Sequence, residues 1–110
     1  MSVYKTELQI TQQPQSNTSI KYREAVTISV SATGADNLSY HWKKDGIDVY
    51  GDHCQGADTP TLTICEFLAD DQGKYSCVIK NCNDSVESEQ AELALGMLVL
   101  LATYKYFNYY

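Results

Sequence analysis

The segment D-Q-G-K-Y-S-C, residues 71–77, places an aspartate, a glycine, a tyrosine and a cysteine at every second position. Upstream of it, L-S-Y-H-W at 38–42 and T-L-T-I at 61–64 alternate apolar with polar residues. This period of two is typical of a strand with one buried face, because successive side chains of a strand point to opposite sides. The three segments therefore predict strands that share one core.

Further short segments continue this pattern along the chain. V-T-I-S-V at 26–30, I-D-V at 47–49 and A-E-L-A-L at 91–95 are separated by turn formers. Short strands at such spacing predict an all-β sandwich or barrel. The alternation predicts these inward residues: Val26, Ile28, Val30, Tyr40, Trp42, Leu62, Ile64, Phe67, Tyr75, Cys77, Ile79, Leu93 and Leu95.

Length and charge restrict the kind of protein further. A chain of 110 residues has room for one core, and its apolar fraction of 44% is ordinary for a globular domain. Fourteen acidic against eight basic residues give a formal net charge of -6, and the basic residues do not cluster. An acidic surface repels a phosphate backbone. We therefore expect one domain and no nucleic-acid partner.

The two ends differ from the middle. The start M-S-V-Y-K-T-E-L-Q-I has no apolar run of the length of a secretory signal. The uncharged run at 93–104 is shorter than the roughly 20 residues that cross a bilayer. We expect a flank at 1–6, a domain at 7–95 and an apolar, tyrosine-rich extension at 96–110. The extension is expected to lengthen the last strand, cover an apolar patch or mediate self-association, and a truncated membrane anchor is the alternative left open.

Trp42, the L-T-I at 62–64 and the D-x-G-x-Y-x-C pattern together resemble the immunoglobulin superfamily, closest to its intermediate-set (I-set) domains. The resemblance covers about residues 7–95, and I-T-Q-Q-P-Q at 10–15 looks like the usual first strand with its proline at the bend. It implies a two-sheet antiparallel Greek-key sandwich. Its signature falls on Val30, Trp42, Leu62, Ile64, Asp71, Gly73, Tyr75 and Cys77.

The resemblance gives these residues specific tasks. Trp42 is expected to fill the centre of the core, Tyr75 to form a tyrosine corner through its hydroxyl, and Gly73 to relieve the turn before it. The chain departs from the family at Val30, which stands where a cysteine usually links the two sheets to Cys77. Cys77 therefore lacks its usual partner.

Cysteines at 54, 65, 77 and 82 allow three fully paired connectivities. The implied topology favours a Cys54–Cys77 disulfide as a replacement for the missing link, worth roughly 3 kcal/mol in the chain-entropy model. A buried free thiol at Cys77 is the alternative. Cys65 is expected to point outward at the end of the strand at 61–64, and Cys82 to lie in a hairpin at the opposite end of the sandwich. A disulfide between these two cysteines is therefore not expected.

Neither metal chemistry nor catalysis is predicted. His41 and His53 are expected to be exposed, and the cysteines lack the close paired spacing of a structural zinc site. His53 and Cys54 are adjacent, but no nucleophile motif places either histidine for catalysis. We expect no enzyme activity, cofactor, metal or small-molecule substrate.

Three asparagines stand in glycosylation sequons, Asn17, Asn37 and Asn83. With the four cysteines they favour an extracellular or cell-surface origin. The missing signal sequence and the valine at position 30 favour the cytoplasm instead.

The resemblance leads to two functional hypotheses. The first is a binding module of a cell-surface receptor or adhesion protein, which contacts a protein ligand, a neighbouring immunoglobulin domain or a second copy of itself. The second is an intracellular structural domain of the titin-like or immune-adaptor kind. The predicted contacts lie on the sheet face at Lys43, Lys44 and Val78, and in the end loops at Asp36, Asn37, Asn81, Asn83 and Asp84.

Overall fold

The computed structural model describes residues 7–34 and 37–96 of the chain. The predicted flank 1–6, loop residue Asp36 and extension residues 97–110 lie outside the described residues. Within the described ranges the chain forms short strands and one turn of 3-10 helix, η1 (Ala69–Asp71). The strands are β1 (Gln9–Gln12), β2 (Asn17–Ile20), β3 (Val26–Ser29), β4 (Ser31–Thr33), β5 (Ser39–Lys44), β6 (Ile47–Asp48), β7 (Cys54–Gln55), β8 (Thr61–Ile64), β9 (Gly73–Lys80), β10 (Ser85–Glu87) and β11 (Ala91–Leu95).

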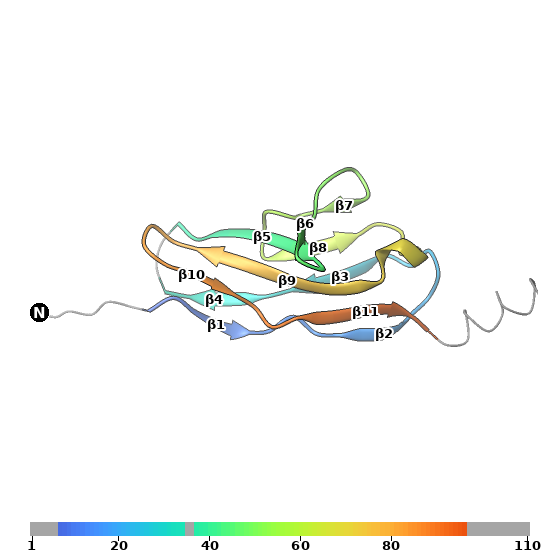
Figure 1. Cartoon of the computed structure of the whole chain (residues 1–110), viewed down its shortest axis with the longest axis horizontal. Coiled ribbons are helices and arrows are strands. Elements are labelled where there is room, and N and C mark those ends of the chain that lie inside the picture. Colours follow the sequence, from blue (N-terminus) through green and yellow to red (C-terminus); the bar gives the residue numbers. More distant parts are fainter. Residues whose placement is uncertain (1–6, 35–36, 97–110) are drawn as a thin grey trace, which may run out of the picture.

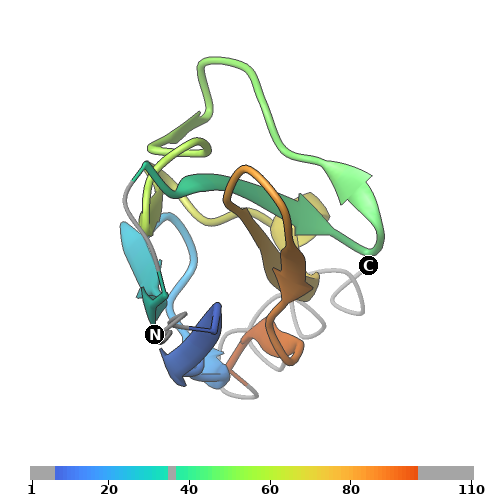
Figure 2. The same cartoon turned by 90° about the vertical axis from the view of Figure 1, so that its left-hand side faces the viewer.

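The strands form two layers around a common core (Figures 1 and 2). One sheet has the order β2-β11-β9-β5-β6, with β10 also paired to β9. The other has the order β3-β8-β7, and β1 pairs with β4, which follows β3 directly along the chain. The predicted all-β sandwich is confirmed. One pairing departs from the antiparallel rule, because β2 runs parallel to β11.

The first strand of the sandwich changes sheets. Instead of one strand at 10–15, the chain forms β1, which pairs with β4, and then β2, which pairs with β11. Pro14 lies between them and is buried. Proline has no amide hydrogen for a sheet ladder, so a break in strand pairing is a favourable place for it.

The core agrees closely with the predicted inward face. Every residue predicted to point inward is buried except Tyr40, which is half-buried. Trp42 pairs with Cys77 across the ladder between β5 and β9, and both side chains are fully buried. The list of predicted inward residues lacked four residues of the buried hydrophobic core, Leu8, Ile20, Val49 and Ala91.

The turn between β5 and β6 follows from its sequence. Asp45 has φ 51° and Gly46 has φ 82°, and Lys44 pairs with Ile47 across the turn. Two positive φ values belong to a type I′ turn, for which Asp-Gly is a favoured pair because glycine adopts that region without strain. The connection between β5 and β6 is therefore a tight hairpin.

Among the described residues there is no helix with the length and apolar character needed to cross a membrane.

Candidate functional site

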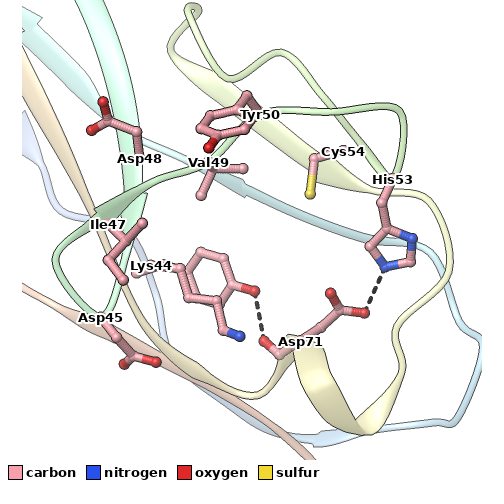
Figure 3. A pocket seen from close by; sticks show the side chains of 10 residues that line it. Lys44, Asp45, Ile47, Asp48, Val49, Tyr50, His53, Cys54 and Asp71 are labelled. Atoms are coloured by element: carbon pink, nitrogen blue, oxygen red, sulfur yellow. Dashed lines mark hydrogen bonds and ion pairs between the residues drawn. The ribbon is translucent and has the colours of Figure 1, made fainter.

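The corner between β8 and β9 centres on Asp71. The hydroxyl of Tyr75 donates to the backbone oxygen of Asp71 at 2.6 Å, which is the tyrosine-corner bond that the resemblance implies. The Asp71 carboxylate accepts from the amide of Leu68 at 2.7 Å and lies 2.7 Å from Nε2 of His53 (Figure 3). Burial, followed by the charge of Asp71, raises the pKa of Tyr75 far above its usual value. The hydroxyl therefore stays protonated as a donor.

Gly73 has a different role from the one expected. Its φ is not in the left-handed region, so the glycine does not relieve a turn. A Cβ at this position would lie 2.7 Å from Oδ2 of Asp45 and 2.9 Å from Cε of Lys44. Asp45 approaches this closely because its Oδ1 accepts from the amide of Lys74 at 2.9 Å and its own amide donates to the Lys74 oxygen at 2.8 Å. Glycine leaves space for the β5–β6 turn to cross the start of β9.

Trp42 fills the core as expected and also fixes the segment before β8. Its indole Nε1 donates to the backbone oxygen of Thr59 at 2.8 Å, and its amide donates to the oxygen of Ala57 at 3.0 Å. Leu62 and Ile64 of β8, and Val30 between β3 and β4, are buried in the same core. These residues are therefore structural.

The cysteines are free thiols in the structure, and the expected Cys54–Cys77 disulfide is not formed. Burial raises the pKa of Cys77 to about 11, with a partial offset from a backbone hydrogen bond of His41. Burial, then the charge of Asp71, also raises the pKa of half-buried Cys54. A high pKa keeps a thiol protonated and a weak nucleophile. Cys65 and Cys82 are exposed.

Both histidines contact carboxylates. His53 pairs with Asp71, while His41 lies between two aspartates, with Nδ1 3.0 Å from Oδ1 of Asp58 and Nε2 3.2 Å from Oδ1 of Asp48. His53 is exposed as predicted, whereas His41 is half-buried and not exposed. His41 joins β6 to the loop before β8. In the part of the chain that the structure describes, no three His, Cys, Asp or Glu residues are grouped as a metal site.

The predicted contact loops lie at one end of the sandwich, seen at the left of Figure 1. Ser39 pairs with Lys80, so the residues before β5 lie beside the β9–β10 hairpin. In that hairpin Oδ1 of Asn81 accepts from the amides of Asn83 at 2.8 Å and Asp84 at 2.6 Å. The Asn81 side chain therefore holds the turn, while Asn83 and Asp84 are exposed.

The three sequon asparagines are all exposed. Asn17 lies in β2, where its Oδ1 accepts from the amide of Ser19 at 3.0 Å. Asn37 has φ 60° and precedes β5, and Asn83 lies in the β9–β10 hairpin. Each position is open to the bulk of a glycan.

A cleft that the sequence did not predict lies between β6 and β7, with a volume of about 330 Å³ (Figure 3). Ile47 and Tyr50 stand on its rim with 70% and 80% of their surfaces exposed. The sequence did carry a signal for this cleft, because the large apolar residues Ile47 and Tyr50 lie on either side of Val49, where the strand alternation ends. The alternation does not predict that β7 lies opposite these residues.

Comparison with known proteins agrees with this architecture. The sequence profile described as immunoglobulin domain matches residues 9–81. The chain is 30% identical over 94 residues to the hepatic and glial cell adhesion molecule of Mus musculus, covering 80% of this chain and 22% of that protein. It is 31% identical over 78 residues to the muscle M-line assembly protein unc-89 of Caenorhabditis elegans, covering 66% of this chain and 1% of that protein.

A solved structure of tandem Ig repeats of Dlar superposes with a TM-score of 0.75 at 24% identity. That match covers 84% of this chain and 49% of the other, and it bears on the fold alone. The family profile, in contrast, includes most of both sheets and the signature residues from Trp42 to Cys77. The chain is therefore a member of the immunoglobulin superfamily.

Proposed function

We propose that this domain is a non-catalytic protein-binding module of a cell-surface receptor or adhesion protein. The observation that carries the proposal is the 30% identity to a cell adhesion molecule over 80% of the chain. The chain spans about a fifth of that relative's length.

The rigid sandwich supports this role through its end loops. The β9–β10 hairpin presents Asn83 and Asp84 to solvent, while Asn81 fixes its shape from within. Loops held by a rigid scaffold carry recognition in this architecture. We assign the first contact surface to this end of the domain, with Asn37 from the neighbouring loop.

A second candidate role is a structural domain inside the cell. Its support is the 31% identity to a muscle M-line assembly protein, together with a core that holds Cys77 as a buried free thiol. A reducing cytosol keeps thiols free, so a sandwich without the inter-sheet link suits that compartment.

A peptide map by mass spectrometry, without reduction, on protein from its natural source separates the two roles. Sugar on Asn17, Asn37 or Asn83, or an oxidised cysteine pair, is the expected result for the cell-surface module. Four free thiols and three bare asparagines would contradict it and favour the intracellular role.

A further inference from the structure

The cleft between β6 and β7 is called the β6–β7 cleft below (Figure 3). β6 and β7 each end a sheet, and both lie away from the end loops at the left of Figure 1. The β5–β6 hairpin forms one wall, and residues 49–54 form the other. Tyr75 and Asp71 line its floor, held together by the tyrosine-corner bond. The floor is therefore rigid, and the opening is set by β6 and the segment after it.

The rim is unusually apolar for this domain. Three large apolar side chains of the described residues are exposed, and two of them, Ile47 and Tyr50, belong to the β6–β7 cleft. The third, Tyr22, lies in the connection between β2 and β3. Val49, between the two rim residues, is 9% exposed and packs in the core. Exposed apolar groups gathered at a cleft are a mark of an interaction site.

β6 is the last strand of its sheet, so one backbone edge of it has no neighbouring strand in that sheet. Lys44 pairs with Ile47 next to the turn, and the amide of Val49 donates to the oxygen of Trp42 at 3.0 Å. Backbone groups alternate in an antiparallel ladder, so the amide and carbonyl of the intervening Asp48 point away from β5. Because β6 ends its sheet, these groups face a free edge that an added strand can use.

The charge of the lining restricts what can enter. Three aspartates, Asp45, Asp48 and Asp71, and one lysine, Lys44, line the cleft, so its lining has an excess of acidic residues. The Lys44 ammonium donates to the backbone oxygen of Asp70, and His53 contacts Asp71. Asp45 accepts from the Lys74 amide and Asp48 contacts His41, so an entering cation would add to contacts that these carboxylates already make. A second copy of this chain carries the same net charge of -6 and is repelled, whereas a basic segment is attracted.

We propose that the β6–β7 cleft docks an extended segment of a protein partner in which arginine or lysine alternates with apolar residues. The segment pairs with the free edge of β6 at Asp48 and places a cationic side chain over the ring of Tyr50, near the carboxylates. This surface is distinct from the end loops, and its assignment does not depend on where the domain works.

A titration of the complete ¹⁵N-labelled chain with the peptide acetyl-Val-Arg-Val-Arg-Val-amide tests the proposal by NMR. The expected result is a set of shift changes centred on the amides of Asp48, Tyr50 and His53. The affinity should fall as salt rises, because exposed charges are screened. Tyr50→Ala should weaken binding roughly two- to fivefold, the loss of an exposed cation–π contact. Tyr22→Ala, the matched exposed-tyrosine control, should bind like the original chain.

Several results would overturn the proposal. They are the absence of shifts at millimolar peptide, shifts centred elsewhere, equal binding of acetyl-Val-Glu-Val-Glu-Val-amide, and no effect of Tyr50→Ala. Sedimentation of the chain alone gives a further check. Self-association abolished by Tyr50→Ala would assign the cleft to a second copy and contradict a basic partner. The peptide map described above tests the cell-surface role separately.

Discussion

The hydroxyl of Tyr75 donates to the backbone oxygen of Asp71 at 2.6 Å, four residues earlier in the chain. This bond closes the corner between η1 and β9, while the Asp71 carboxylate contacts His53 in the segment leading to β7. One residue thus joins the corner to both sheets of the sandwich. It also fixes the floor of the β6–β7 cleft.

Tyr75→Phe should lower the free energy of unfolding by about 1 to 2 kcal/mol, because the Asp71 carbonyl loses its donor in a partly buried place. Urea denaturation followed by tryptophan fluorescence measures this through Trp42. Tyr22→Phe, at a position 52% exposed, is the control and should change stability by less than about 0.5 kcal/mol. Equal effects of the two variants would show that the corner bond contributes nothing.

Val30→Cys should create the disulfide that the family usually has. Val30, between β3 and β4, and Cys77, in β9, are both buried in the core. Closing the long loop between them is worth roughly 4 kcal/mol in the chain-entropy model. The oxidised variant should therefore melt well above the original chain and lose that gain in reductant. Val30→Cys with Cys77→Ala cannot form the bond and is the control. A variant that stays reduced under an oxidising buffer would contradict the prediction.

Much of the fold was predictable because a strand buried on one face has a strict period of two. Trp42, Leu62, Ile64, Tyr75 and Cys77 all fall on the predicted inward face and are buried. The tyrosine corner was predicted from the resemblance to the immunoglobulin superfamily, through a D-x-G-x-Y-x-C pattern in which the donor Tyr75 and the acceptor Asp71 are local in sequence. Short-range patterns of this kind do not need three-dimensional information.

The missing parts depend on contacts between distant segments. β7 contains two residues and exists only through its pairing with β8. Position 73 requires glycine because the Asp45 carboxylate occupies the space that a Cβ would need, and only the folding of the β5–β6 hairpin brings Asp45 there. The β6–β7 cleft forms where the β5–β6 hairpin and the segment leading to β7 come together. Residue alternation along the chain shows that its rim residues are apolar, but it does not show that these two segments meet.

Alkaline conditions should destabilise the domain through Cys77. Its pKa rises from 9.0 to about 11 on folding, so above pH 9 the unfolded chain loses a proton that the folded chain keeps. The contribution of the Cys77 thiol to the free energy of unfolding is therefore at its full value below pH 9. It falls by about 2 to 3 kcal/mol as the pH approaches 11. Tyr75, with its pKa also raised, adds to the loss at higher pH. Denaturation curves at pH 8 to 11 measure the slope.

The Cys77→Ala variant isolates the thiol in this experiment. It lacks the titrating group, so its stability should fall less steeply between pH 9 and pH 11 than that of the original chain. Parallel slopes in the two proteins would mean that burial of Cys77 does not resist ionisation.

Gly73→Ala should cost about 1 kcal/mol of stability. The new Cβ meets the Asp45 carboxylate at 2.7 Å, and moving that side chain gives up its bond to the Lys74 amide. Most of the cost should disappear in an Asp45→Gly background, because the clashing carboxylate is gone and glycine suits the φ of 51° at position 45. The remaining close contact, at 2.9 Å, is with Cε of Lys44 near the end of a flexible side chain that can move aside. A double-mutant cycle by urea denaturation should give a coupling of about 1 kcal/mol between the two positions. An unchanged cost in both backgrounds would show that something other than Asp45 requires glycine at the start of β9.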